Sequence, residues 1–379
     1  MTHLLVALSS HGFGHAAQAA AVVNAWRRRQ PQLRLTLRTL LPADLLARRF
    51  EGEFELAPCH TDVGMLMSSA LDADLAATAA AYAQFHTEWD RRVHDEANAL
   101  ARLAPDLVLA DVPYLPLVAA ATIPIPAVAM CSLNWADIYA HYFLGTRPEA
   151  PDIHAQILDA YQRADCFLQL EPSMPMANLS RRIAIGPVAH VGINRRATLI
   201  AALGLSPTTR LAAISLGGID MRLPVEHWPS LTNVHWLVPA SWKVAHRAFT
   251  AMESLDMLIT DMLSSVDVLI GKPGYGTFTE AACHGTRVLY VRRPDWPEDP
   301  CLVDWLTRHG NALEISRQQL ELGDLTVPLR KLLEQPQRPP VIPAGIDHAV
   351  NRLMSQWSGS TATRYSKREF KLSDRAPKS

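Results

Sequence analysis

The chain has 379 residues, more than one small hydrophobic core requires and enough for two domains of ordinary size. Hydrophobic residues make up 49% and charged residues 19%, and 36 basic against 37 acidic side chains leave a formal net charge of -1. These values exclude a disordered chain. The near-neutral charge also argues against a protein built to bind nucleic acid phosphates, so we expect no nucleic acid partner.

No stretch of the sequence is predicted to cross a membrane. The longest weakly polar run, Leu115–Met130, contains three prolines and is shorter than the roughly 20 residues that a spanning helix needs. The apolar patch Leu4–Leu8 lacks the charged flank and cleavage site of a signal peptide. The five cysteines form no CxxC pair, a pattern typical of a reducing compartment and not of a zinc site. We therefore expect a cytoplasmic protein with no bound metal.

Short apolar runs alternate with Ala/Leu-rich segments of helical period, which predicts parallel strands joined by crossover helices. The first predicted helix runs from about Ala16 to Arg29 and is stopped by Pro31. Strands are predicted in the first half at Leu4–Leu8, Leu33–Thr39, Leu107–Ala110 and Ala127–Cys131. Strands are predicted in the second half at Leu211–Leu216, Val234–Val238, Val266–Ile270 and Val288–Val291.

A linker is predicted within Gly186–Thr209, where Gly, Pro, Arg and short apolar runs mix. The fold class is therefore α/β, with two Rossmann-like, doubly wound parallel-sheet domains. We place the N-terminal domain at 1–193, the C-terminal domain at 194–357 and a disordered basic tail at 358–379. Two such domains facing each other put the carboxyl ends of both sets of strands around one interdomain cleft, where ligands bind.

A His/Gly turn, SSHGFGH, lies between the first predicted strand and the first helix. Gly12 and Gly14 allow a tight turn and close approach of a ligand to the backbone. His15 falls at the helix N-terminus, where the positive end of the dipole is expected to lower its pKa and keep it able to accept a proton. The sequence thus predicts either a general base or a histidine that only caps or packs the first turn.

The same turn matches the dinucleotide fingerprint G-x-G-x-x-G/A through Gly12, Gly14 and Ala17. That fingerprint also needs an acidic residue at the end of the next strand, and the predicted strand Leu33–Thr39 has none there. Arg38 at this position is compatible with a 2′-phosphate, which leaves NADP binding as an alternative.

Two polar residues follow predicted strands of the first half. Asp111 comes directly after Leu107–Ala110, and Asn134 follows the strand that ends at Cys131. If these strands run parallel to the first, both residues share an edge of the sheet with His15. Asp111 is then expected to orient the imidazole, as the carboxylate of a catalytic triad does. The alternative is that Asp111 caps the segment after it.

The second half contains the segment DVLIGKPGYGTFTE, a strand followed by a glycine-rich loop and a helix. The loop glycines, the charge of Lys272 and the free amides of the helix start, around Tyr275, predict a diphosphate site. Thr277 and Glu280 also match a capping box, which is the structural alternative for both. The loop glycines are Gly271, Gly274 and Gly276. Two further groups are predicted near the same edge, namely Gly217 with Gly218 and the polar loop with Glu298 and Asp299.

These motifs resemble those of a known fold family. The His/Gly turn together with GKPGYGTFTEAACHGTRVLYV resembles GT-B glycosyltransferases, including the lipid-linked N-acetylglucosaminyltransferase of peptidoglycan synthesis and UDP-glycosyltransferases. The stretches HGFGH, LADVP, SLNWADIYAHY, GKPGYGTFTEA and VRRPDWPEDP are similar to the glycosyltransferase-like N-terminal region of plant L-arabinokinases. The resemblance runs over most of residues 1–355.

The resemblance implies an N-terminal acceptor domain and a C-terminal domain that holds a nucleotide-sugar donor. His15 falls where the family has its catalytic or acceptor-side histidine. The implied donor contacts are Glu280 with the ribose, Gly274, Gly276 and Thr277 with the diphosphate, and the loop at Glu298 and Asp299 with the sugar.

We therefore expect a metal-independent glycosyltransferase that uses a UDP-linked sugar as co-substrate, with no other cofactor. The expected acceptor is a small molecule or a lipid. Two alternatives stay open: a non-catalytic sensor or scaffold that binds nucleotide sugars, and a sugar-nucleotide 2-epimerase on the same fold. The sequence does not predict the oligomeric state.

Overall fold

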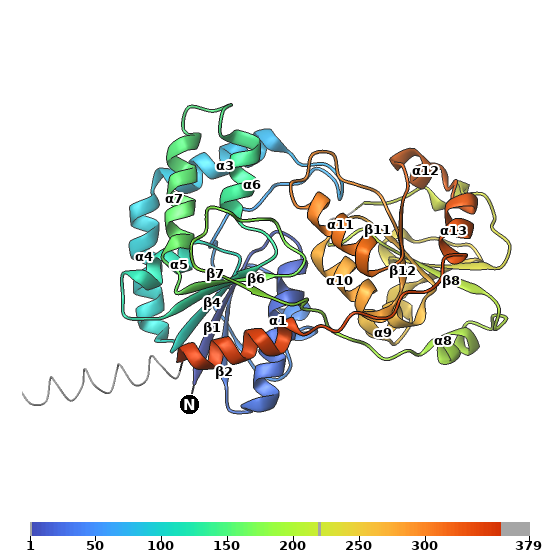
Figure 1. The fold of residues 1–379 in the computed structure, drawn as a ribbon, viewed down its shortest axis with the longest axis horizontal. Helices are drawn as coiled ribbons and strands as arrows, with labels where there is room; N and C mark the ends of the chain where they lie inside the picture. The colour runs from blue at the N-terminus through green and yellow to red at the C-terminus, as the bar shows by residue number, and fades with distance from the viewer. Residues whose placement is uncertain (1, 219–220, 358–379) are drawn as a thin grey trace, which may run out of the picture.

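The computed structural model describes residues 2–218 and 221–357, which form two α/β lobes side by side (Figure 1). The sheet of the first lobe has seven parallel strands in the order β3-β2-β1-β4-β5-β6-β7. Its strands are β1 (His3–Leu8), β2 (Arg34–Arg38), β3 (Glu55–Leu56), β4 (Leu107–Asp111), β5 (Ala127–Cys131), β6 (Cys166–Leu170) and β7 (Arg182–Ile185). Its helices are α1 (Gly14–Arg29), α2 (Ala43–Ala47), α3 (Leu75–Thr87), α4 (Trp89–Leu103), α5 (Leu115–Ala121), α6 (Trp135–Phe143) and α7 (Ala150–Gln162).

The sheet of the second lobe has six parallel strands in the order β10-β9-β8-β11-β12-β13. Its strands are β8 (Arg210–Ser215), β9 (Val234–Val238), β10 (Phe249–Ala251), β11 (Val268–Gly271), β12 (Arg287–Tyr290) and β13 (Ala312–Glu314). Its helices are α8 (Arg196–Ala202), α9 (Ile259–Ser265), α10 (Tyr275–His284), α11 (Asp299–His309), α12 (Arg317–Leu322) and α13 (Thr326–Leu333), with short 3-10 turns η1 (Val225–His227), η2 (Ala240–Trp242) and η3 (Met252–Ser254).

The predicted two-domain architecture of parallel sheets is confirmed, and each of the eight predicted strands is present to within two residues at either end. Five strands were not predicted. Four of them, β3, β7, β10 and β13, are the edge strands of the two sheets. Edge strands are short and only partly buried, so their hydrophobic pattern is weak. The fifth, β6, lies one strand in from an edge.

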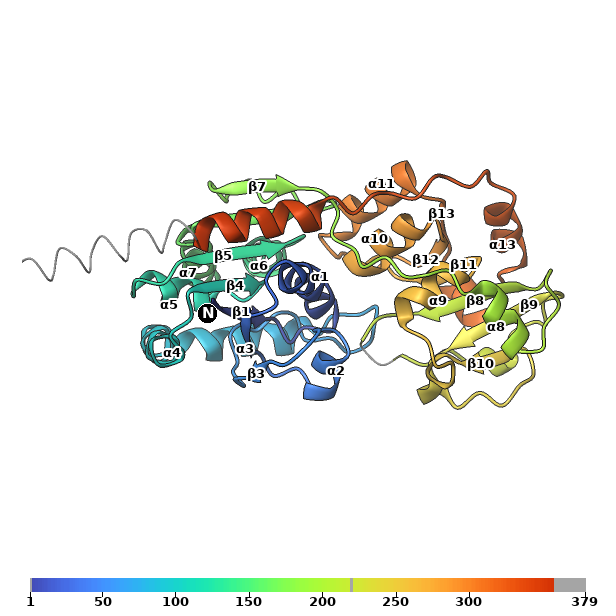
Figure 2. The same cartoon turned by 90° about the horizontal axis from the view of Figure 1, so that it is seen from below.

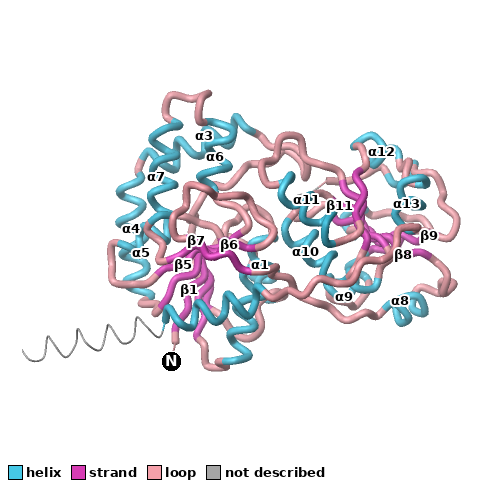
Figure 3. Tube along the Cα trace, viewed as in Figure 1, coloured by secondary structure: helices cyan, strands magenta, loops and turns pink. Residues whose placement is uncertain are grey.

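Helices cover both faces of each sheet. On one face of the first sheet α1 packs through Ala16, Val22 and Trp26, and on the opposite face the aromatic residues of α3, α6 and α7 form a second cluster. The core around α1 continues into the second lobe through α10 and α11, so one apolar cluster joins the two domains. Loops of both domains also run between the lobes (Figure 3). Burial of this shared cluster is expected to hold the domains together.

A last helix, 345–357, follows the second lobe and lies along the first (Figure 2). Ala349, Val350 and Leu353 join the same core as α1, and Arg29 at the end of α1 donates to Asn351 at 2.7 Å. The division of the chain at residue 193 stays a prediction. The predicted tail, 358–379, lies outside the described residues.

The two chain segments that connect the domains cross each other at Gly186 and Gly345. The amide of Gly345 donates to the carbonyl of Pro187 at 3.0 Å, and a Cβ atom at Gly345 would overlap the carbonyl oxygen of Gly186. The crossing therefore requires glycine at position 345, because no side chain atom fits between the two backbones.

Replacing Gly345 by alanine is expected to lower the free energy of unfolding by about 1–3 kcal/mol, because the added methyl group forces the two crossing backbones apart. Gly145→Ala is the matched control, since the space around Gly145 is open. Thermal unfolding of both variants measures the difference. Equal midpoints for the two variants would show that the crossing tolerates a side chain.

Candidate active site

The turn between β1 and α1 has the tight geometry expected of its glycines. Gly12 has a φ of +77°, in the left-handed region that favours glycine, and a Cβ atom at Gly14 would meet nothing within 4 Å. The residue before the helix, Phe13, provides no side-chain cap. The first amides of α1 are therefore left without a side-chain partner from the cap position.

His15 and Asp111 meet at the carboxyl ends of β1 and β4, as the sequence predicts for parallel neighbouring strands. Leu8 pairs with Asp111 in the sheet register, and His15 stands in the first turn of the helix after β1. The imidazole Nδ1 lies 3.0 Å from Asp111 Oδ1, and the two residues are 5% and 0% exposed. With the carboxylate accepting from Nδ1–H, the second imidazole nitrogen, Nε2, is free to accept a proton.

The alternative in which Asp111 caps the next segment is not observed, because its carboxylate pairs with His15. Asn134 is on the same side of the sheet, but it caps α6: its side chain accepts from the amide of Asp137 at 2.8 Å. It is fully buried, and it has a structural role in the first turn of that helix.

The pKa of His15 is raised, not lowered as predicted from the helix dipole. Burial lowers this pKa, but the hydrogen bond and charge of Asp111, together with the charges of Asp62 and Glu298, outweigh the burial. The expectation was wrong because a carboxylate in contact outweighs the partial charge of a helix end. His15 is thus held as part of an imidazole–carboxylate pair that binds its proton more firmly.

Asp62 is a buried neighbour of this pair that sequence reasoning missed. Its Oδ2 accepts from Trp135 Nε1 at 2.7 Å, and the Trp135 ring lies edge-on to His15 at 6.0 Å between ring centroids. Burial raises the pKa of Asp62, and hydrogen bonds from Ser9 and Trp135 oppose that rise. The only signal in the sequence is an isolated Asp just before an Ala-rich stretch, which is too common to single out.

Helix α10 begins at Tyr275 with Gly274 as its cap residue, and no side chain caps it. The predicted capping box is therefore wrong. Thr277 and Glu280 lie within the helix, and their side chains do not bond the cap. Added Cβ atoms would meet nothing within 4 Å at Gly276 and no atom closer than 3.8 Å at Gly274. No side chain therefore occupies the first amides of α10 from the cap position, as an anion site requires.

Lys272 stands beside this helix start and beside the loop after β8. A Cβ atom at Gly217, where φ is +91°, would lie 3.5 Å from Lys272 Cε. The pKa of Lys272 is lowered to about 7, mainly by burial and to a smaller extent by the charge of Arg293. The charges of Asp299 and Glu298 oppose the shift. The ammonium is therefore less stable than in water, and a bound anion would stabilise it.

Gly218 and Phe13 bring the two domains into contact at this place. A Cβ atom at Gly218 would clash with the Phe13 ring, so the loop after β8 lies directly against the His/Gly turn of the first domain. Helix α1 likewise contacts α10. The structure thus brings the predicted groups of both domains, Gly12 and Gly14 on one side and Gly217, Gly218 and Lys272 on the other, to one interface.

Tyr275 and Glu280 differ in what their side chains can offer a ligand. The Tyr275 hydroxyl accepts from the amide of Val188 at 2.8 Å and donates to the carbonyl of Glu171 at 3.2 Å, so its side chain holds the linker. Burial raises the pKa of Glu280 to about 7, opposed by the charge of Arg49. In the described part of the chain the Glu280 carboxylate has no hydrogen-bond or ion-pair partner.

Glu298 and Asp299 lie at the start of α11, and both are buried against protein groups. Glu298 accepts from Ser132 Oγ of the first domain at 2.7 Å. Asp299 accepts from Arg293 Nε at 3.1 Å and from its amide at 3.0 Å. Trp296 in the same loop stacks on His11, with 5.8 Å between ring centroids. This loop joins the two domains, and its contact with a donor sugar stays a prediction.

The NADP alternative depended on a free Arg38. In the structure Arg38 is buried and its Nε donates to Glu96 Oε1 at 2.6 Å, with a second bond from its Nη2 to Oε2. A buried bidentate ion pair of this kind neutralises the guanidinium and holds it away from a 2′-phosphate. Arg38 therefore does not support NADP binding.

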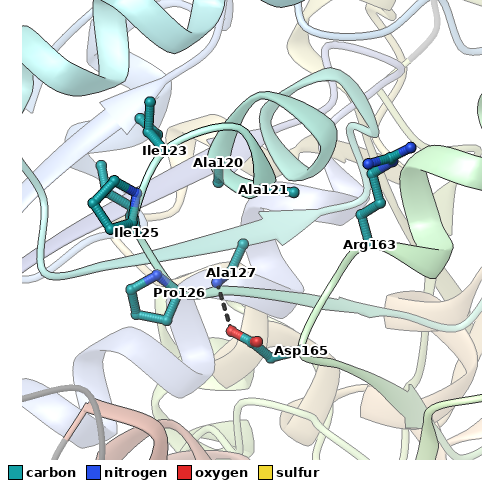
Figure 4. A pocket seen from close by; sticks show the side chains of 9 residues that line it. Ala120, Ala121, Ile123, Ile125, Pro126, Ala127, Arg163 and Asp165 are labelled. Atoms are coloured by element: carbon teal, nitrogen blue, oxygen red, sulfur yellow. Dashed lines mark hydrogen bonds between the residues drawn. The ribbon is translucent and has the colours of Figure 1, made fainter. Parts of the chain in front are cut away.

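A pocket of about 240 Å³ lies at the opposite end of the first sheet, where β5 begins (Figure 4). Ile123, Ile125 and Pro126 line it together with the polar residues Arg163 and Asp165, and Asp165 accepts from the amide of Ala127 at 2.9 Å. This pocket is far from the ends of the strands at which His15 and Asp111 meet.

Comparisons with known proteins agree on the fold. No family model matches the chain. It is similar to L-arabinokinase of Arabidopsis thaliana, with 24% identity over 339 residues, and the match covers 86% of this chain. The chain spans about a third (32%) of the length of that relative.

Solved structures also match along nearly the whole chain, and three of them illustrate the likeness. The glycotransferase of kitacinnamycin has a TM-score of 0.60 and 17% identity, covering 97% of this chain and 98% of that one. The glycosyltransferase VinC in complex with DTDP has a TM-score of 0.54 and 15% identity, covering 99% and 100%. A putative UDP-N-acetylglucosamine 2-epimerase from Listeria monocytogenes has a TM-score of 0.55 and 13% identity, covering 95% and 98%.

These likenesses, together with the two parallel sheets, show that the chain has the GT-B fold. The fold predicted from the sequence is confirmed. Among residues 2–218 and 221–357, none of the helices has the length and apolar character to span a bilayer.

Proposed function

We propose that this protein is a glycosyltransferase that moves a sugar from a nucleoside-diphosphate donor, most simply a UDP-sugar, to an acceptor hydroxyl. One observation carries the proposal: the uncapped N-terminus of α10, with Lys272 beside it, meets the His15–Asp111 pair across a single domain interface. The fold likeness to glycosyltransferases supports it.

His15 acts in this proposal as the general base. Nε2 takes the proton of the acceptor hydroxyl as the oxygen attacks the anomeric carbon of the donor. Asp111 holds the imidazole in the tautomer with Nδ1 protonated and stabilises the imidazolium that forms. The raised pKa of His15 follows from this partnership, because the same carboxylate that orients the ring also stabilises its charged form.

The leaving nucleoside diphosphate gains negative charge as the bond to the sugar breaks. The free amides at the start of α10 and the ammonium of Lys272 lie where they can stabilise that charge. These protein groups supply the positive potential that a divalent ion supplies elsewhere, so we propose that the transfer needs no metal. Closure of the two domains around the bound substrates would exclude water from the reacting groups.

The proposed role of Lys272 makes donor binding depend on pH. Since its pKa is lowered to about 7, the ammonium is charged well below pH 7 and loses its proton as the pH rises through this value. The affinity for UDP-glucose, whose diphosphate does not titrate in this range, is therefore expected to be highest below pH 7 and to fall as pH rises. Calorimetry at a series of pH values measures this.

Lys272→Met is the matched variant for this measurement. It removes the ammonium while keeping an unbranched side chain, and it is expected to bind the donor more weakly and with a flat pH profile. A pH dependence that persists unchanged in Lys272→Met would assign the titration to another group.

A direct test of the function is a panel of nucleoside diphosphates and their sugars, read by thermal shift and by donor turnover. Stability rises with RT ln(1 + [L]/Kd), so the correct nucleotide stands out from the panel. Binding followed by sugar transfer supports the proposal. Tight binding without any turnover of the donor, with or without acceptors, would instead indicate a sensor or scaffold.

The 2-epimerase is the second candidate, and the carboxylates of the buried Asp62 and the partly buried Glu280 favour it. Both pKa values are raised, that of Glu280 to about 7, which suits proton transfer at a sugar carbon. The fold likeness to the putative UDP-N-acetylglucosamine 2-epimerase from Listeria monocytogenes agrees with this candidate. Incorporation of deuterium from the solvent at C2 of a UDP-N-acetylhexosamine, with no acceptor present, would identify an epimerase.

A further inference from the structure

Cys131 completes a buried three-residue cluster with His15 and Asp111, which the proposed transfer does not use. Its Sγ lies 3.7 Å from His15 Nδ1 and 3.7 Å from Gln18 Oε1. One donor atom of each of the three residues falls within 4.8 Å of the other two. Among the described residues, this is the one group of three or more His, Cys, Asp or Glu side chains that converge in this way.

The geometry points to a binding site for one zinc-class divalent ion at His15, Asp111 and Cys131. In a tetrahedral zinc site with bonds of roughly 2.0–2.3 Å, neighbouring ligand atoms are roughly 3.3–3.8 Å apart. The Nδ1–Oδ1 and Nδ1–Sγ separations of 3.0 Å and 3.7 Å are close to this spacing without any ion in place. The Asp111 carboxylate and Cys131 Sγ also lie within 4.8 Å of each other, so side-chain rotation can bring all three atoms around one ion.

The donor set selects the class of ion. One thiol sulfur, one imidazole nitrogen and one carboxylate oxygen are the ligands that zinc takes, whereas calcium and magnesium prefer oxygen alone. Three protein ligands leave a fourth position for water or another molecule, as in open zinc sites.

Two further observations favour a cation here. Asp111 Oδ2 is buried and has no hydrogen-bond partner within the described part of the chain, and an unsatisfied buried oxygen is costly. The carboxylates of Asp62 and Glu298 add negative charge, since both act on the imidazole of His15. A divalent ion would satisfy the free carboxylate oxygen and interact favourably with these carboxylates.

Binding changes the protonation of the cluster. The Cys131 thiol releases one proton to solvent and coordinates as a thiolate. The neutral imidazole of His15 coordinates through Nδ1, and its proton moves from Nδ1 to Nε2. The hydrogen bond between Nδ1 and Asp111 is then broken. If the proposed transfer is correct, the loaded protein has no basic Nε2 and is inhibited; ion binding itself does not depend on that proposal.

The test uses the full chain, freed of metal with a chelator and titrated with Co²⁺ as the probe. We expect one Co²⁺ per chain, a thiolate-to-cobalt charge-transfer band, and displacement of the Co²⁺ by Zn²⁺. Cys131→Ser is expected to lose the band, and Asp111→Asn to bind at least about tenfold more weakly. Cys166→Ser, which alters a buried thiol on the neighbouring strand β6, is the matched control and keeps the band.

If the variants do not fold, X-ray absorption spectroscopy of zinc bound to the wild-type chain identifies the ligands instead. One sulfur ligand with nitrogen and oxygen ligands supports the site. A zinc or cobalt spectrum without sulfur, or a band that persists in Cys131→Ser, overturns it. Because these readouts involve no sugar transfer, a failure of the glycosyltransferase proposal leaves them unaffected.

Discussion

Replacing His15 by alanine is expected to lower kcat for sugar transfer by about 10²- to 10⁴-fold, the usual contribution of a positioned general base. The imidazole is held by Asp111 at 3.0 Å, and no other base lies in the first turn of α1. The affinity for the nucleotide sugar is expected to change little, because the proposed diphosphate site is on the other domain. Steady-state kinetics with calorimetry separates the two effects.

His94→Ala is the matched control for this variant, since His94 is exposed on α4, away from the domain interface. It is expected to retain wild-type kcat. A His15→Ala protein that is folded, binds donor and keeps its kcat would remove the imidazole from the mechanism.

The Asp111→Asn variant is expected to change the pH dependence of kcat. The carboxylate raises the pKa of His15, so its loss lets burial lower that pKa. The base must be unprotonated, and kcat therefore rises as the pH passes through the pKa of His15 in the enzyme–substrate complex. We expect the midpoint of this rise to move to lower pH in Asp111→Asn, with a lower plateau because the amide no longer stabilises the imidazolium. A midpoint that does not move would show that another group sets the profile.

Gly276→Asp is expected to reduce donor affinity by about 100-fold or more. The position is at the start of α10 and has open space where a side chain would stand, so the variant should fold. An aspartate in the first turn also suits the helix dipole. Its carboxylate, however, would compete for the free amides and repel the diphosphate that we place there. Calorimetry with UDP and UDP-glucose measures the loss.

Gly276→Ala separates charge from size at this position. The methyl group enters open space and is expected to weaken binding far less than the carboxylate does. Thermal unfolding of both variants confirms that the fold is kept. If Gly276→Asp binds UDP as tightly as Gly276→Ala, the phosphates do not lie at this helix end.

The central strands could be predicted from the sequence because each is buried on both faces and reads as a continuous apolar run, as in β1, β4, β5 and β11. The short edge strands lack this signal. The turns after β1 and β11 could also be predicted, since glycines between a strand and a helix leave few other structures possible.

The candidate site could be predicted only in part, for a physical reason that differs between residues. His15 and Asp111 meet because parallel strands end at one edge of the sheet, a consequence of topology that the sequence reveals. The contact of Glu298 with Ser132 depends on how two domains dock, which no local pattern encodes. The raised pKa of His15 depends on Asp62 and Glu298, and neither could be placed beside it in advance.

A crystal structure of the full chain with a non-transferable UDP-sugar analogue examines the whole proposal at once. The pyrophosphate should be bonded to the backbone amides of Gly276 and Thr277 and to the Lys272 ammonium, with the anomeric carbon turned toward His15 Nε2. Phosphates bound at any other place on the chain, or a sugar held away from that imidazole, would contradict the account.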